Sequence, residues 1–138
     1  MLAKECMTKN VEIGAPNMTL AEAAMKMRDG DFGALPISES DRLIGMLTDR
    51  DIAIRAVANG KDPNKAFVGE VMSRKVLYCF DDQDVNEIVK NLGDNQIRRL
   101  PVLNRQKRLV GILSLGNLAL SDAKPEDVDA ALAKISKK

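Results

Sequence analysis

The residues best suited to chemistry lie in the stretch 45–52, Gly-Met-Leu-Thr-Asp-Arg-Asp-Ile. An apolar run suited to a buried strand ends there, and Thr48 and Asp49 are good N-cap residues for a following helix. A helix start exposes unpaired N–H groups and the positive end of the dipole, which favours an anion such as phosphate. Thr48 adds a hydroxyl, and Asp51 adds a carboxylate that can accept hydrogen bonds from a diol. The stretch therefore predicts a phosphate corner beside a sugar acceptor.

The same pattern has a purely structural interpretation. A Thr-x-x-Asp at a helix start is typical of a capping box, which only satisfies backbone N–H groups. What favours a ligand is that the stretch occurs twice, because residues 111–118, Gly-Ile-Leu-Ser-Leu-Gly-Asn-Leu, repeat its glycine, hydroxyl and acid or amide. Ser114 and Asn117 then correspond to Thr48 and Asp51.

Composition excludes several other classes of function. The chain has 138 residues, 45% apolar and 30% charged, with a net charge of +1, which argues against a nucleic-acid or membrane-surface binder. It has no signal-peptide run and no stretch near the roughly 20 apolar residues that span a membrane. There is no His, and Cys6 and Cys79 match no metal-binding spacing, so we predict no metal site. A cytoplasmic, reducing location is the simplest assumption.

Self-comparison shows an internal repeat. Met7-Thr8 reappears as Met72-Ser73, and Leu35-Pro36-Ile37 reappears as Leu100-Pro101-Val102, each 65 positions later. Gly45 reappears as Gly111, so the second copy carries one extra residue before that glycine. We therefore divide the chain into a first repeat, residues 1–64, a second repeat, residues 65–121, and a tail, residues 122–138.

Each repeat predicts a short helical lead-in followed by the order β-α-β-β-α. Thr19 with Glu22 and Asp84 with Glu87 mark the first helix of each repeat, which carries an apolar i, i+3, i+4, i+7 stripe. The second helix starts at Thr48 or Ser114. The predicted strands are Val11–Ile13, Ala34–Ser38 and Leu43–Leu47 in the first repeat, and Val76–Tyr78, Leu100–Leu103 and Leu109–Leu113 in the second.

The tail predicts one more helix. Pro125 and the acids after it suit a first helical turn, and Val128, Ala131, Leu132 and Ile135 recur at helical spacing. We expect this amphipathic helix to pack on the body of the protein or on a second subunit.

Together these motifs resemble a tandem pair of cystathionine-β-synthase (CBS) domains over roughly residues 2–121. The resemblance rests on the Met-Thr/Ser lead-ins, on Gly33-Ala34-Leu35-Pro36-Ile37 and Arg98-Arg99-Leu100-Pro101-Val102, and on the two Gly-x-x-Thr/Ser-x-x-Asp/Asn stretches. The chain looks like a small stand-alone bacterial CBS-pair protein with no enzyme or channel domain attached.

The resemblance implies an α/β (α+β) fold in which the two repeats pack with pseudo-two-fold symmetry and leave two clefts for adenine nucleotides or related adenosyl compounds. By position, Thr48 and Ser114 would meet phosphate, and Asp51 and Asn117 would meet ribose. The residues before Leu-Pro typically line a cleft. These are Gly33 and Ala34 in the first repeat and Arg98 and Arg99 in the second.

The two clefts are expected to differ. A nucleotide at Thr48 and Asp51 would meet Arg98 or Arg99, whose forked donors suit phosphate, whereas one at Ser114 and Asn117 would meet Gly33 and Ala34, which give room but no charge. A solvated strand edge is the other interpretation of the two arginines. Arg50 is another candidate for phosphate and equally a plain exposed residue. For the base we name Val11, Ile13, Val76 and Tyr78.

The sequence thus predicts a regulatory module that binds an adenine nucleotide, AMP, ADP or ATP, with no obligatory cofactor, and that signals by a change of shape or of dimer geometry. We expect a homodimer, no membrane association and an unidentified regulated protein as a further partner. The alternative is a ligand-free dimerisation adaptor. An enzyme is disfavoured because the sequence offers no His and no nucleophile–base pair, and a nucleic-acid binder because the chain is close to neutral.

Overall fold

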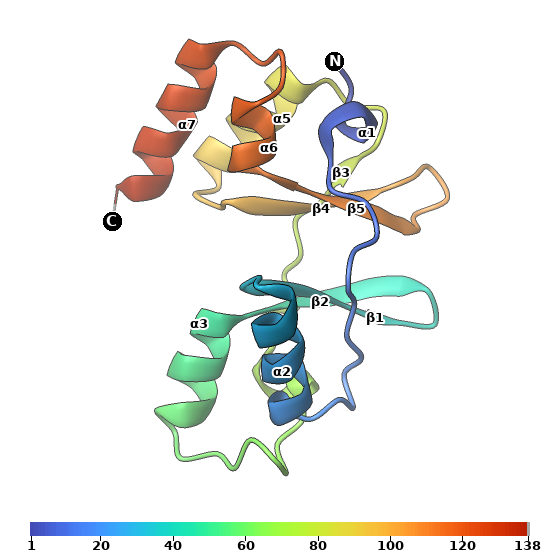
Figure 1. Ribbon diagram of the computed structural model, residues 1–138, viewed down its shortest axis with the longest axis vertical. Helices are drawn as coiled ribbons and strands as arrows, with labels where there is room; N and C mark the ends of the chain where they lie inside the picture. The colour runs from blue at the N-terminus through green and yellow to red at the C-terminus, as the bar shows by residue number, and fades with distance from the viewer. Residues whose placement is uncertain (138) are drawn as a thin grey trace. The chain divides into compact units, whose positions relative to one another are not determined.

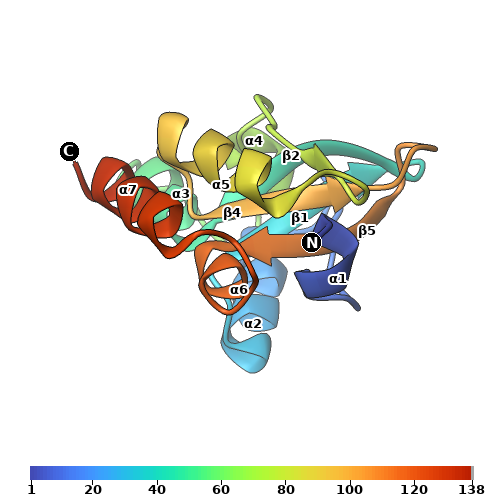
Figure 2. The same ribbon diagram turned by 90° about the horizontal axis from the view of Figure 1, so that it is seen from above.

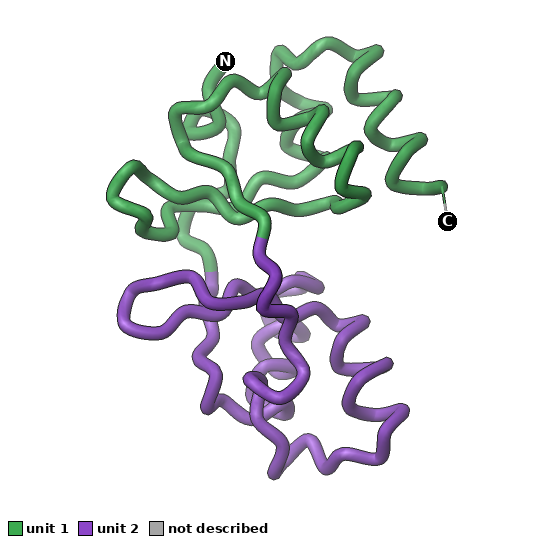
Figure 3. Tube along the Cα trace, turned by 180° about the vertical axis from the view of Figure 1, so that it is seen from behind, with its two compact units in different colours: residues 1–11, 77–138 green, residues 12–76 purple. Residues whose placement is uncertain are grey.

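The compact units of the structure do not coincide with the sequence repeats. The computed structural model describes residues 1–137, which form unit 1, residues 1–11 with residues 77–137, and unit 2, residues 12–76 (Figure 3). The chain therefore passes between units after residue 11 and after residue 76, rather than at the repeat boundary after residue 64. The first eleven residues belong with the hairpin and helices of the second repeat.

Unit 2 contains a two-stranded antiparallel sheet with helices on one side (Figure 1). Strand β1, Ala34–Glu39, pairs with β2, Arg42–Thr48, and the register sets Ala34 opposite Thr48. Gly14 makes a parallel bridge to Ile37 of β1. The helices are α2, Leu20–Gly30; α3, Asp49–Asp51, with its π-helical continuation η1, Ile52–Val57; and α4, Val68–Val71.

Unit 1 repeats this plan and adds the tail helix. Strand β3, Cys79–Phe80, runs parallel to β4, Arg99–Leu103, which is antiparallel to β5, Leu109–Ser114. The helices are α1, Ala3–Cys6; α5, Val85–Asp94; α6, Leu115–Ala119; and α7, Pro125–Ser136. The family-type fold expected from the repeats, a mixed α/β arrangement with two sheets and a C-terminal helix, is confirmed.

The caps and apolar stripes of the first helices also form as expected. Thr19 Oγ1 accepts the N–H of Glu22 at 3.2 Å, and Asp84 Oδ1 accepts the N–H of Asn86 at 2.8 Å. The stripes supply most of the two cores, although Ala24 is exposed. The buried stripe residues are Leu20, Ala23 and Met27 in α2 and Val85, Ile88, Val89 and Leu92 in α5.

Two predicted strands are wrong. Residues 11–13 and 76–78 have no ladder partner, and the strand of the second repeat is instead Cys79–Phe80. The reason is the path of the chain, because both segments adjoin the points where it passes from one unit to the other. Only after the crossing does the backbone come alongside β1, at Gly14, or alongside β4, at Cys79.

The lead-ins of the two repeats are exchanged. The N–H of Thr8 donates to the carbonyl of Ile112 at 2.8 Å, and the N–H of Ile112 donates back to Thr8 at 3.0 Å. In unit 2, Ser73 and Met46 exchange the same pair of hydrogen bonds, at 2.8 and 2.9 Å. Each Met-Thr or Met-Ser segment therefore extends the hairpin of the other repeat.

The repeated glycines exist because of this exchange. A Cβ on Gly111 would lie 2.9 Å from the carbonyl oxygen of Thr8, and one on Gly45 would lie 2.8 Å from that of Ser73. These distances are too short for a real Cβ, so a side chain at either position would push the exchanged segment away. The glycine that opens each Gly-x-x-Thr/Ser stretch is thus a packing requirement.

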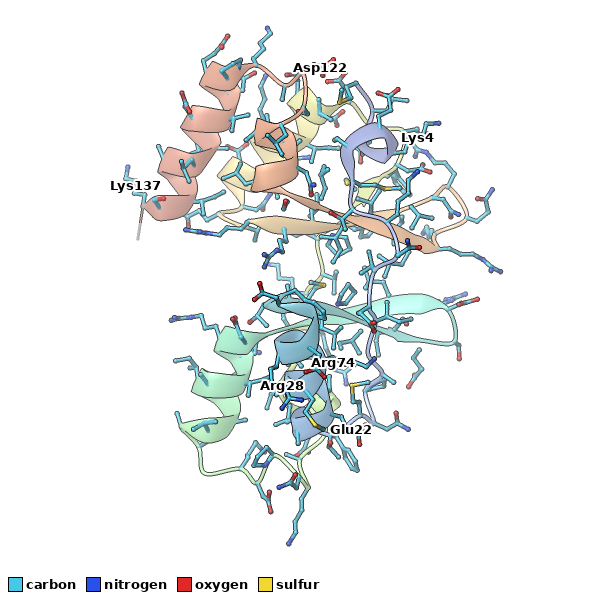
Figure 4. All side chains as sticks on the ribbon, in the orientation of Figure 1. Lys4, Glu22, Arg28, Arg74, Asp122 and Lys137 are labelled. Atoms are coloured by element: carbon cyan, nitrogen blue, oxygen red, sulfur yellow. The ribbon has the colours of Figure 1, made fainter. Side chains whose placement is uncertain are left out.

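Helix α1 is held firmly to unit 1. The N–H of Ala3 donates to the carbonyl of Gln83 at 2.9 Å, and the N-terminal ammonium lies 3.5 Å from Oδ2 of Asp122. Figure 4 labels Asp122, in the turn before α7, and Lys4, on α1. Ala3 is fully buried. The lead-in is therefore an integral part of the unit 1 core.

The tail helix packs on its own unit. Helix α7 lies beside α5 and α6 in both views (Figures 1 and 2), with Ala131 and Ile135 buried. Gly93 of α5 allows the close approach, because a Cβ there would lie 3.0 Å from the Cα of Ala131. Leu132, expected in the apolar stripe, is 46% exposed, and Lys138 of the predicted tail lies outside the described residues.

One core residue gives the fold a pH dependence. Burial raises the pKa of the Cys79 thiol from 9.0 to about 12, because the thiolate is poorly solvated there. A group whose pKa is raised on folding stabilises the native state below its unfolded pKa and loses that effect as the pH rises towards its folded pKa. We therefore expect the free energy of unfolding to fall between about pH 9 and pH 12. Urea titrations at several pH values will measure the free energy of unfolding of the wild type and of Cys79→Ala. If this free energy falls equally with pH in both proteins, the prediction is wrong.

Within residues 1–137, no helix has both the length and the apolar character needed to cross a membrane.

Candidate functional site

The Thr48 site lies where β2 ends and α3 begins. Thr48 Oγ1 accepts the N–H of Asp51 at 3.1 Å, and Asp51 Oδ2 accepts the N–H of Thr48 at 2.9 Å. The two side chains thus form a reciprocal capping box, the structural interpretation that the sequence left open. A ligand would have to bind through the hydrogen-bonding groups of Thr48 and Asp51 that the capping box does not use.

Asp51 keeps acceptor capacity after capping. Its second oxygen, Oδ1, lies 3.8 Å from Nε of Arg55, and the side chain is 16% exposed. A carboxylate has about four lone-pair sites, so one hydrogen bond and one long ion pair leave room for further donors. Asp51 can therefore still accept hydrogen bonds from a sugar diol.

The Ser114 site is more fully satisfied. Asn117 Oδ1 accepts from both the N–H of Ser114, at 2.9 Å, and its hydroxyl, at 2.8 Å, while the N–H of Asn117 donates to Ser114 Oγ at 3.0 Å. An amide oxygen has two lone pairs, and both are used. The amide nitrogen points to Thr8 Oγ1 at 3.5 Å. Asn117 can thus offer a ligand a donor but little acceptor capacity.

The space beside Gly33 was expected to carry no charge, but a carboxylate lies next to it. The N–H of Asp49 donates to the carbonyl of Gly33 at 2.9 Å, and Asp49 Oδ2 lies 2.8 Å from where a Cβ on Gly33 would be. Ala34, opposite Thr48 in the register, is buried. The structure thus brings Gly33, Ala34 and Thr48 together but adds a carboxylate that the sequence did not assign.

The second repeat places basic residues at the matching positions. Arg99 lies opposite Ser114 in the β4–β5 register, and the carbonyl of Arg98 accepts the N–H of Leu115 at 3.0 Å. Both arginines are exposed. The Ser114 site therefore carries two nearby cations, whereas Arg50 and Arg55 near Thr48 are balanced by Asp49 and Asp51. Because Arg98 and Arg99 belong to unit 1 whereas Thr48 and Asp51 belong to unit 2, their meeting with a nucleotide held at Thr48 stays a prediction.

The four residues named for base recognition divide between the units. Val11 and Tyr78 belong to unit 1, and Ile13 and Val76 belong to unit 2. Tyr78 is 43% exposed and Ile13 is 46% exposed, so both present apolar surface to an incoming group. Val11 and Val76 are half-buried at the crossings between units.

Three residues near the sites were missed by sequence analysis. Arg55 pairs with Asp51 and also donates through Nη1 to the carbonyl of Val71 at 3.3 Å. Its i+4 spacing from Asp51 was a usable signal. The sequence contains no such signal for Asp49 or Thr8. The placement of Asp49 depends on the approach of the Gly33 backbone, and that of Thr8 depends on the exchanged lead-in. Among residues 1–137 there is no group of three or more metal-ligating side chains.

A model of the CBS domain matches the chain twice, at residues 3–57 and 68–123. The chain therefore belongs to the CBS-domain family, as a tandem pair.

Named relatives agree with this assignment. The chain is 41% identical to the CBS domain-containing protein YhcV of Bacillus subtilis over 133 residues, which cover 96% of this chain and 94% of YhcV. It is 41% identical to hypoxic response protein 1 of Mycobacterium tuberculosis over 118 residues, covering 85% and 82% of the two chains. A crystal structure of that protein with two coordinated zinc ions superposes with a TM-score of 0.79, covering 87% of this chain and 98% of that one.

One further solved structure is of a ligand complex. The CBS-domain pair of protein MJ0100, in complex with 5′-methylthioadenosine and S-adenosyl-L-methionine, has 27% identity and a TM-score of 0.77, covering 87% of this chain and 94% of that one. Family membership and this complex support a regulatory, ligand-binding role for the present chain.

Proposed function

We propose that the protein is a non-enzymatic regulatory module that binds an adenine nucleotide or a related adenosyl ligand and reports its level by a change of conformation or dimer geometry. The observation that carries the proposal is that the same helix start occurs twice. Thr48 and Ser114 end equivalent strands, and Asp51 and Asn117 lie in the first turn of the helices that follow. The adenosyl ligands in the MJ0100 complex support the choice of ligand class.

The two sites are expected to divide the ligand's groups differently. The spare acceptor capacity of Asp51 suits a ribose diol, and the charge of the carboxylate strengthens such hydrogen bonds. Arg98 and Arg99 supply the positive charge that suits phosphates, whereas the one hydroxyl hydrogen of Ser114 is already donated to Asn117. A ligand shifts a conformational equilibrium only through its different affinity for the two states. To act as a signal, the ligand must therefore bind one conformation of the protein more tightly than the other.

Calorimetric titration tests the proposal. AMP, ADP, ATP and adenosine should bind, and GMP serves as the control for base specificity. A ligand-free adaptor is the competing function, favoured by the observation that both motif pairs already satisfy each other as capping boxes. Heats of dilution alone for all four adenine compounds, and for S-adenosyl-L-methionine, would contradict the proposal and favour the adaptor. Incubation with ATP without turnover would agree with the absence of catalysis, and steady release of ADP would contradict it.

We also expect a homodimer. The apolar face of the tail helix is not available for dimer contacts, because α7 packs on α5 of its own unit. Large apolar side chains remain exposed on unit 2, with Met25 at 44%, Ile54 at 53% and Val57 at 66%. Light scattering at micromolar concentration should give about twice the chain mass of 15.1 kDa. A monomer both with and without AMP would contradict this.

A further inference from the structure

Arg55 joins the Thr48 site to the end of helix α4. Its Nε lies 3.8 Å from Oδ1 of Asp51, and its Nη1 donates to the carbonyl of Val71 at 3.3 Å. Val71 is the last residue of α4, and the Met72-Ser73 lead-in follows it directly. A single side chain therefore contacts both the predicted sugar acceptor and the helix that carries the lead-in.

The Met72-Ser73 lead-in is seated on β2. Ser73 and Met46 exchange two hydrogen bonds, at 2.8 and 2.9 Å, and the N–H of Met72 donates to the carbonyl of Val68 in α4 at 2.9 Å. The helix and the lead-in are thus one continuous piece of chain. A movement of the lead-in away from β2 would carry the Val71 carbonyl with it.

The distance between Arg55 and Asp51 matters for a ligand. At 3.8 Å the Nε is beyond hydrogen-bond distance from Oδ1, so this oxygen keeps its lone pairs for a diol. The Arg55 side chain is 53% exposed, and a shift of roughly 1 Å would bring it into a charge-assisted hydrogen bond with the same oxygen. The bond to Val71 holds the guanidinium back from that position.

Unit 1 has a serine where unit 2 has Arg55. The hydroxyl of this residue, Ser121, donates to the carbonyl of Leu118 at 2.6 Å, within its own turn. Asn117 instead reaches the lead-in of unit 1 directly, through Nδ2 to Thr8 Oγ1 at 3.5 Å. The arginine link is therefore particular to the unit whose sugar acceptor carries a charge.

We propose that Arg55 is a positioning residue that leaves Asp51 open to a sugar only while the Met72-Ser73 lead-in is seated on β2. When the lead-in leaves β2, the Val71 carbonyl leaves with it, and Arg55 closes onto Asp51 Oδ1 in competition with the diol. A ligand at Asp51 must then favour the seated lead-in by the same factor by which seating favours the ligand. The inference rests on the proposed function and deepens it, because it names the segment that responds to the ligand.

Calorimetric titration with adenosine, which is uncharged, tests the inference without phosphate contacts. The heat that disappears in Asp51→Ala belongs to the Thr48 site. Gly45→Ala unseats the lead-in, because its Cβ would lie 2.8 Å from the carbonyl oxygen of Ser73. It should weaken adenosine binding about five- to tenfold in the presence of Arg55, and by less than about twofold in Arg55→Met. A nucleoside without the diol, dideoxyadenosine, should bind Gly45→Ala and the wild type equally.

Amide hydrogen exchange tests the reciprocal effect. Saturating adenosine should slow exchange at Ser73 about five- to tenfold in the wild type and leave it nearly unchanged in Arg55→Met. This measurement needs no substitution at Gly45, so it decides the question if Gly45→Ala does not fold. The matched control is Arg42→Met, which removes the same charge from an exposed position at the other end of β2 and should keep the slowing.

A merely structural role for Arg55 gives different results. Gly45→Ala would then reduce adenosine affinity equally with and without Arg55, and adenosine would slow exchange at Ser73 equally in the wild type and in Arg55→Met. Either result would overturn the inference while leaving the proposed function in place. A wild-type protein that gives no heat of binding with adenosine would instead overturn the proposed function, and this inference with it.

Discussion

Replacing Asp51 by alanine should weaken adenosine binding at the Thr48 site by about one to two powers of ten. A hydrogen bond to a charged group is worth roughly 1.5–3 kcal/mol, and Asp51 retains both its charge and free lone pairs after capping the helix. Asn117→Ala should weaken its own site by tenfold at most, because a neutral partner is worth roughly 0.5–1.5 kcal/mol. Calorimetric titration with adenosine measures both.

A reciprocal pair of variants separates binding from capping. Asp51→Ala also removes a helix cap, but Asp51→Asn should keep it, since Asn117 forms the equivalent box with Ser114. Asp51→Asn should therefore lose affinity without loss of stability, and Asn117→Asp should gain affinity in unit 1. If Asn117→Ala reduces binding more than Asp51→Ala, the assignment of the sugar acceptor is wrong.

Gly111→Val should destabilise the protein by about 3 kcal/mol. Its Cβ would lie 2.6 Å from Met7 Sδ and 2.9 Å from the backbone oxygen of Thr8. The sulfur can move aside but the backbone cannot, so the lead-in must leave β5 and give up both hydrogen bonds to Ile112. Urea unfolding gives the free energy, and amide hydrogen exchange at Ile112 shows whether the lead-in has detached.

Gly116→Ala is the control for this prediction. Its Cβ would meet only Ser114 Oγ, at 3.5 Å, so the change should be neutral or slightly stabilising in a helix. A Gly111→Val protein as stable as the wild type, with slow exchange at Ile112, would show that the close approach does not hold the lead-in in place.

Local patterns were enough to predict much of this fold. The caps at Thr19 and Asp84, both hairpins and the tail helix follow from composition and spacing, because each depends on neighbours within a few residues. The helix starts at Thr48 and Ser114 were predicted for the same reason. Whether those residues bind a ligand is a separate question that spacing cannot decide.

The rest depends on contacts between distant segments. Nothing near Thr8 indicates that it pairs with Ile112, more than one hundred residues away, so the exchange of lead-ins and the loss of strand pairing at residues 11–13 could not be predicted. The Asp49 carboxylate beside Gly33 and the saturated oxygen of Asn117 are likewise details of side-chain direction. They change the electrostatics of the sites without altering any motif.

The most direct test of the proposed function is mass spectrometry of the small molecules released when the purified protein is denatured. The protein should release an adenosyl compound, or should retain AMP after incubation with it followed by gel filtration. Asp51→Ala combined with Asn117→Ala should retain less. A wild-type protein that releases no adenosyl compound and retains no AMP would contradict the account and leave the ligand-free adaptor as its function.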